Sequence, residues 1–179
     1  GDKRSIAKAL AIYSGFTEGL QLFSSFIILL NFPRFGKMKG MGQIITYSIR
    51  DESLHVEAMT KLFREFIQEN IDIWTDDFKG EIYQACREMV ALEDRFLDLV
   101  FEQGDIVGLT KKEMQQYIRY IADRRLLQLG LKPNYKVKDN PLNWLDDVLG
   151  VEHQNFFEGR ATTYMKAGLR GNVEKVKFA

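Results

Sequence analysis

Glu52 and His55 are the residues of this sequence whose types and spacing most directly suggest chemistry. Residues three apart on a helix leave the same face, so the carboxylate and the imidazole can converge on one point. Both belong to a stripe with steps of three and four residues, which predicts a helix face turned toward a core. The stripe comprises Ile45, Ser48, Glu52, His55, Met59, Leu62 and Phe66. Carboxylate oxygen with imidazole nitrogen suits iron, manganese or zinc; the alternative for a lone motif is a hydrogen-bonded or surface pair.

Glu18 is a second isolated carboxylate, the only acidic residue between Asp2 and Asp51. It shares a helical stripe with Ala11, Leu22, Ser25 and Leu29. Because its helix is apolar on both sides, we expect its carboxylate to face the core, the alternative being an exposed edge. Glu93 is a rival inward carboxylate, but with no histidine nearby we expect it to be a hydrogen-bonded or edge residue.

The number of these residues limits the kind of metal site. A ferritin-like di-metal bundle uses one Glu from each of two helices and one Glu-x-x-His from each of two others. Only Glu52 has a histidine three residues later in this sequence. With Glu18, the chain therefore holds half of the required ligands. A second polypeptide, a second copy across a two-fold axis or a preceding N-terminal half would have to supply the rest.

Four long helices are expected to position these residues. Helical patterns run from about Lys3 to Asn31, ended by Pro33, and from about Met41 to Asn70. A third helix follows N-cap residues at 75–77 and reaches about Gln103, and a capping box at 110–113 opens a fourth that ends near Leu129. The short Gly-rich link at 33–42 favours antiparallel neighbours, which would bring Glu18 opposite Glu52.

Composition predicts one mostly helical domain over residues 1–179. The chain is 45% hydrophobic, enough for a sizeable core, and shorter helices are expected at 141–149 and 155–167, with His153 in a surface loop and 170–179 as an exposed tail. Lys+Arg and Asp+Glu are both 25, which argues against nucleic-acid binding. The apolar run 20–32 is shorter than the roughly 20 residues of a membrane span. With one cysteine, Cys86, and no signal-peptide pattern, we expect a cytoplasmic protein.

Five stretches of the sequence resemble a known family. They are FTEGLQLFSSF at 16–26, IRDESLH at 49–55, the segment 108–125 with YIADRR at its end, NPLNW at 140–144 and NFFE at 155–158. They resemble the C-terminal half of the class I ribonucleotide reductase small subunit, the radical-generating chain. The resemblance implies a ferritin-like helical bundle in which Glu18, Glu52 and His55 hold the second metal of an oxygen-activating di-iron, manganese or mixed manganese–iron centre.

The same resemblance assigns expected roles around that centre. Asp51 resembles an aspartate that hydrogen-bonds a metal-ligand histidine on the radical-transfer route, and Arg50 resembles its neighbour. Phe26, and Leu22 where some members have phenylalanine, resemble the apolar wall near the radical. These assignments rest on the family pattern alone.

Two departures from the family pattern predict partners. The N-terminal half, with the first metal's ligands and usually the radical-bearing tyrosine, has no counterpart before Gly1, and the flexible C-terminal peptide that docks on the large subunit ends short at Ala179. We therefore expect a split subunit, or a fragment completed by a partner chain, that is inactive alone. The complete assembly would be a dimer of small subunits that reduces ribonucleotides with the large catalytic subunit.

Other functions remain open from the sequence. Another ferritin-like di-iron oxidase or oxygenase would bind metal without a nucleotide-reducing partner. A metal-free helical scaffold would keep Glu18, Glu52 and His55 only as hydrogen-bonding residues. A two-fold homodimer with one shared site ranks lower, because members of the family build each site within one chain.

Overall fold

The computed structural model describes residues 2–146, and every named element within them is helical. In chain order these are α1 (Lys3–Ile12), the π-helical η1 (Tyr13–Gln21), α2 (Leu22–Arg34), α3 (Lys39–Glu69), the short 3₁₀ helix η2 (Ile71–Ile73), α4 (Asp76–Val100) and α5 (Lys111–Gln128). The predicted all-α class is confirmed. The predicted helix at 155–167, the last three residues of the one at 141–149, His153 and the tail at 170–179 lie outside the described residues, and residues 144–146 of the second segment are helical.

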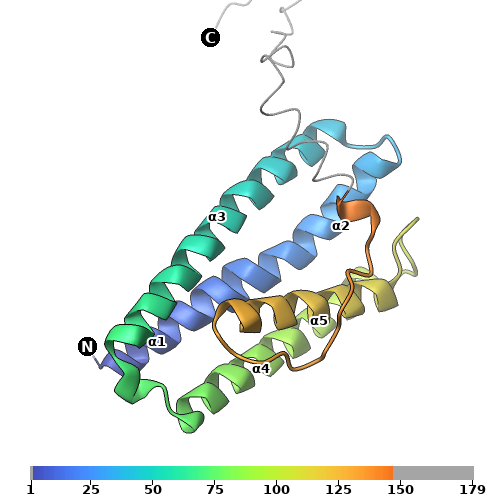
Figure 1. Ribbon diagram of the computed structural model, residues 1–179. Coiled ribbons are helices and arrows are strands. Elements are labelled where there is room, and N and C mark those ends of the chain that lie inside the picture. The colour runs from blue at the N-terminus through green and yellow to red at the C-terminus, as the bar shows by residue number, and fades with distance from the viewer. Residues whose placement is uncertain (1, 147–179) are drawn as a thin grey trace, which may run out of the picture.

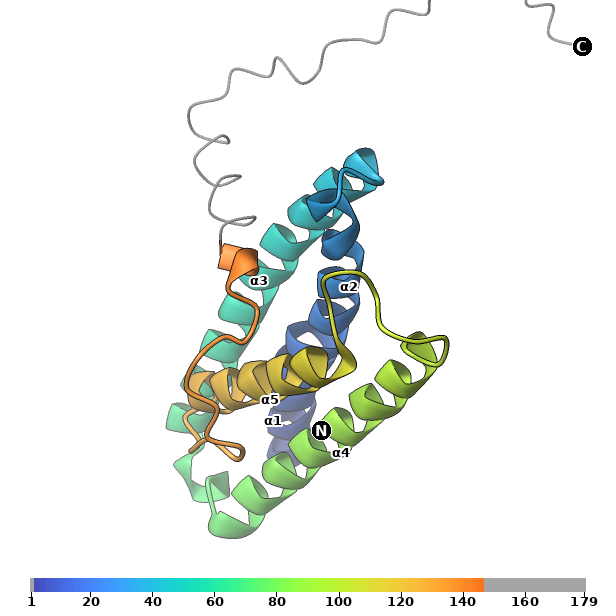
Figure 2. The ribbon, with the colours of Figure 1, turned by 90° about the vertical axis from the view of Figure 1, so that its right-hand side faces the viewer.

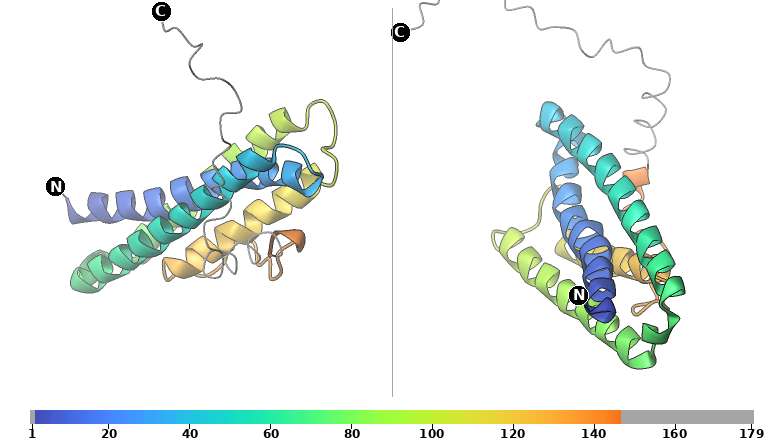
Figure 3. Two further views of the ribbon diagram at one scale, coloured as in Figure 1. Left: turned by 90° about the horizontal axis from the view of Figure 1, so that it is seen from above. Right: turned by 90° about the vertical axis from the view of Figure 1, so that its left-hand side faces the viewer.

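One long helix, formed by α1, η1 and α2 in succession, lies at the centre of the bundle (Figure 1). It runs antiparallel to α3, as the short link predicts, and it also contacts α4 and α5 on its other side (Figures 2 and 3). By length and apolar composition alone, residues Lys3–Arg34 would also suit a membrane span. Half of that apolar window is buried against the other helices. An apolar composition is also what a helix at the centre of a bundle needs.

The prediction that this helix ends before Pro33 is wrong by three residues. Pro33 lies in the last turn, where its missing N–H removes one hydrogen bond without breaking the helix behind it. The backbone N–H groups of Phe35 and Lys37 then donate to the carbonyl of Phe32, both at 3.1 Å, and close the turn. Gly36 follows with a φ of 72°, a conformation that glycine adopts without strain.

The buried face of α3 is not the predicted stripe but the one beside it. Its buried residues are Gly42, Ile49, Val56, Thr60, Phe63 and Ile67. In the predicted stripe Leu62 is 50% exposed and His55 is exposed too, because α3 packs along α1, η1 and α2 while α4 and α5 lie beyond that long helix. The helices described here thus cover one side of α3 and leave the Glu52–His55 side partly open.

Helices α4 and α5 begin as their sequences predict. The Thr75 side chain accepts from the N–H of Phe78, and Thr110 with Glu113 forms the complete capping box. Their apolar faces build the core with the long helix, and Cys86 is fully buried there, which raises the pKa of its thiol to about 12. Helix α4 ends at Val100, a little before the predicted Gln103.

The capping box gives the first testable prediction. Replacing Thr110 with alanine removes the side chain that accepts from the Glu113 N–H at 3.2 Å, so about 1 kcal/mol of unfolding free energy should be lost. Urea denaturation measures this, with Lys112→Ala as the control because Lys112 is exposed in the same turn. Equal midpoints for the two variants would show that the capping box does not stabilise the fold.

Candidate metal centre

Three predicted site residues meet on the open side of the α3–η1 contact. Glu18 comes from η1, and Glu52 and His55 come from consecutive turns of α3. Each offers one ligand atom, and these carboxylate oxygens and imidazole nitrogen all lie within 4.8 Å of one another. One cation can therefore reach all three groups with small side-chain adjustments. The antiparallel packing of two helices produces this arrangement from residues 34 positions apart in sequence.

Burial and hydrogen bonding indicate what the site accepts. Among the described residues, nothing donates a hydrogen bond to Glu18 Oε2 or Glu52 Oε2, although both oxygens are buried. His55 Nδ1 lies 3.5 Å from Glu52 Oε2, and its side chain is 61% exposed. A buried oxygen without a donor costs about 1–3 kcal/mol, and a bound cation removes that cost. The donor set of two carboxylates and one imidazole thus fits a metal such as iron or manganese.

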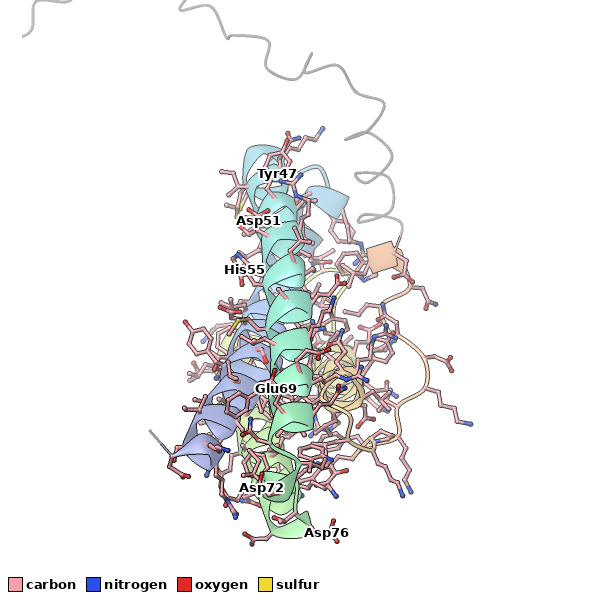
Figure 4. The ribbon with its side chains drawn as sticks, turned by 60° about the vertical axis from the view of Figure 1, so that its left-hand side comes forward. Tyr47, Asp51, His55, Glu69, Asp72 and Asp76 are labelled. Carbon is pink, nitrogen blue, oxygen red and sulfur yellow. The ribbon has the colours of Figure 1, made fainter. Side chains whose placement is uncertain are left out.

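Asp51 and Arg50 lie next to the site on the solvent side of α3. Asp51 precedes His55 by one helical turn, and the two side chains leave the same side of the helix (Figure 4). Arg50 Nε lies 3.5 Å from Asp51 Oδ1, and the Arg50 guanidinium lies 5.5 Å from the Tyr47 ring centroid. Both side chains are substantially exposed. The structure thus places Asp51 and Arg50 beside the three ligand candidates without bringing them into the cluster.

Leu22 and Phe26 follow Glu18 along one face of the long helix, at intervals of four residues. Leu22 is 36% exposed, and the Phe26 ring packs edge to face on Phe23 with the centroids 6.1 Å apart. Their role as an apolar wall near the radical stays a prediction from the family resemblance.

Sequence reasoning missed the local conformation of Glu18. Residues 13–21 form a π-helix, and such widened segments occur frequently at functional sites. Gly15 and Gly19 within it were the only sequence signal. It also missed Arg125 on α5, whose Nε donates to the Gly19 carbonyl at 2.8 Å.

Glu93 is hydrogen-bonded, as expected, and lies outside the three-residue cluster. It is 6% exposed on α4, and the Ser24 hydroxyl contacts its Oε2. Burial raises the pKa of Glu93 above the ordinary 4.5, the charge of Asp94 acts in the same direction, and the Ser24 hydrogen bond opposes both. Glu93 is therefore a buried acid of the core.

A pH-dependent stability follows for Glu93. Because its folded-state pKa is raised, the folded protein retains a proton that the unfolded chain releases, so its contribution is present below pH 4.5 and is lost as the pH rises. The Glu93→Gln variant has no such proton to lose. Its free energy of unfolding, relative to that of the wild type, should therefore increase as the pH rises above 4.5. Denaturant titrations at several pH values measure the difference, with the exposed Glu88→Gln as control. An advantage that shrinks with pH would contradict the assignment.

Comparison with known proteins decides the family. Residues 1–141 match the family model described as ribonucleotide reductase, small chain. The chain belongs to this family. Among small-chain relatives, the probable ribonucleoside-diphosphate reductase small subunit 048L of Invertebrate iridescent virus 3 is 47% identical over 93% of this chain and 45% of its own length. The subunit beta of Chlamydia pneumoniae is 36% identical over 90% of this chain and 46% of its own.

Solved small-chain structures confirm the predicted ferritin-like fold. A putative class I ribonucleotide reductase from Bacillus halodurans superimposes with a TM-score of 0.77 at 30% identity, covering 82% of this chain and 52% of that one. The ribonucleotide reductase R2 subunit from Clostridium botulinum gives a TM-score of 0.74 at 30% identity, covering 79% and 44%. The chain spans about half the length of the small chains that it matches.

Proposed function

We propose that this chain is the C-terminal half of a ribonucleotide reductase small subunit and binds one metal of its di-metal centre through Glu18, Glu52 and His55. The observation that carries the proposal is the cluster of three ligand atoms within 4.8 Å, two of whose carboxylates have a buried oxygen without a hydrogen-bond donor among the described residues. Family membership gives the cluster its chemical context.

The metals are iron, manganese or one of each, which the donor set accommodates. When bound, the metal pair supplies the electrons that activate dioxygen and generate the radical used to reduce ribonucleotides. The residues of this chain hold and orient the ions: Glu18 from η1, and Glu52 with His55 from α3. Leu22 and Phe26 keep water from the radical side, and Asp51 with Arg50 continues the hydrogen-bonded route toward the large subunit.

A complementary N-terminal half supplies the remaining ligands, either on a separate chain or on the same one. This rests on two observations. The sequence holds one Glu and one Glu-x-x-His, half of the ferritin-like ligand set. The α3 side that carries Glu52 and His55 is partly open, with Leu62 half exposed. The assembled protein, called here the complete small subunit, forms a dimer, works in the cytoplasm with the large catalytic subunit and binds no nucleic acid.

Metal content and mass test this proposal. This chain is purified alone and with the complementary half, and each preparation is weighed by native mass spectrometry and analysed for metals. The proposal expects about two metals per complete small subunit and none in the lone chain. Absence of metal from both preparations would remove Glu18, Glu52 and His55 from catalysis and favour the metal-free scaffold.

A further inference from the structure

Among the arginines that the structure describes, Arg125 is the buried one, and it contacts the π-helical segment. It is 8% exposed, and burial lowers the pKa of its guanidinium to about 10, so it stays charged at neutral pH. Among the described residues no carboxylate forms an ion pair with it. Burying a cation without an anion costs free energy, so we expect the contacts of Arg125 to serve the function of the protein.

One of its contacts lies on the turn that carries Glu18. Arg125 Nε donates to the Gly19 carbonyl at 2.8 Å, in a buried hydrogen bond between α5 and η1. Its Nη1 donates to Gln128 Oε1 at 2.8 Å, and its guanidinium lies 5.0 Å from the Phe23 ring centroid. The guanidinium thus has three partners, and the acceptor of its buried hydrogen bond is the carbonyl of Gly19, the residue that follows the candidate ligand Glu18.

Gly19 is shaped to receive this contact. A Cβ atom at position 19 would lie 2.7 Å from Arg125 Nε and 2.7 Å from the Ser14 carbonyl oxygen, distances that real Cβ atoms do not adopt. Any larger side chain would displace Arg125 or alter the π-helical turn. Glycine at 19 and arginine at 125 therefore form a matched pair across the two helices.

We propose that Arg125 is a positioning residue that fixes the π-helical turn at Gly19 and thereby sets the place of the Glu18 carboxylate for the metal. A π-helical turn is a local departure from regular helix pairing, so an outside donor on its carbonyl stabilises that geometry over the regular one. Groups that orient a ligand typically change metal affinity by about 10–100-fold. This inference rests on the proposed function, because it requires Glu18 to bind metal.

The test measures Mn²⁺ binding to the complete small subunit by calorimetry, with the electron paramagnetic resonance spectrum of the bound ion as a second readout. The variants are Arg125→Met and Gly19→Ala, which remove the contact from opposite sides. The control for Arg125→Met is Arg124→Met, because Arg124 donates to the Tyr120 hydroxyl at 3.2 Å and not to the π-helical turn. The control for Gly19→Ala is Gly80→Ala, because a Cβ atom added at position 80 meets nothing within 4 Å. Circular dichroism and thermal unfolding monitor the fold.

Both variants should bind Mn²⁺ about 10–100-fold more weakly and change its spectrum, while the controls behave as the wild type. If Arg125→Met does not fold, Arg125→Gln, which removes the charge and keeps a polar side chain, takes its place, because Gly19→Ala also brings a Cβ atom to 2.7 Å from the Ser14 carbonyl oxygen. Wild-type affinity and spectrum in a folded variant would overturn the role of Arg125 alone. Absence of Mn²⁺ binding by the wild type would instead overturn the proposed function.

Discussion

Replacing Glu52 with alanine is expected to weaken metal binding, and so to destabilise the metal-loaded protein, but to stabilise the metal-free protein. In the metal-loaded complete small subunit, loss of a ligand should weaken metal binding by more than the roughly 100-fold upper range for groups that only orient ligands. Without metal, the variant should be about 1 kcal/mol more stable than the wild type, because it no longer buries Glu52 Oε2 without a donor. Metal analysis and denaturant titration with and without a chelator measure the two effects.

Glu57→Ala is the matched control, since Glu57 is an exposed glutamate on the same helix. It should leave metal content unchanged and show no gain in stability after chelation. If Glu52→Ala retained the metal content of this control, Glu52 would not be a ligand. If it lost stability equally in both states, the side chain would serve packing rather than metal binding.

The second large effect is expected at the open side of α3. Leu62 is 50% exposed on the helix face that carries Glu52 and His55, and we expect the complementary half to cover it. Burial of a leucine side chain contributes about 1.5–3 kcal/mol, so Leu62→Glu should weaken association of the halves by at least tenfold. Analytical ultracentrifugation measures the dissociation constant of the two halves. When the halves share one chain, denaturant titration measures the loss of unfolding free energy instead.

Leu99→Glu is its control, because Leu99 is 73% exposed on α4, on the far side of the long helix. This substitution introduces the same charge at an exposed apolar position. If both variants associated equally well, the complementary half would not cover the Glu52–His55 side of α3. The arrangement proposed for the di-metal centre would then be wrong.

Local signals made the helices predictable. The capping box at Thr110 and Glu113 and the N-cap at Thr75 are contained in four consecutive residues each, and the structure forms both. Pro33 misled the boundary prediction because the proline restriction does not exclude the last turn of a helix, where only Arg34 follows it and one hydrogen bond is lost. Helix order and type therefore followed from short-range chemistry.

The site was predictable only in part. Glu18 and the Glu52–His55 pair could be brought together from helical spacing and a short link. The buried stripe of α3 was misassigned by one position, because a periodic pattern does not say which neighbouring helices are present. The role of Arg125 could not be predicted from the sequence. Two adjacent arginines are typical of a charged surface, and the contact of Arg125 with Gly19 joins residues 106 positions apart.

Anomalous diffraction from crystals of the complete small subunit, collected on both sides of the iron and manganese absorption edges, would locate and identify its metals. We expect two peaks, one of them at coordination distance, about 2.0–2.3 Å, from Glu18, Glu52 and His55 together. A fully assembled subunit with no peak beside these three side chains, or with a metal bound only elsewhere, would contradict this expectation.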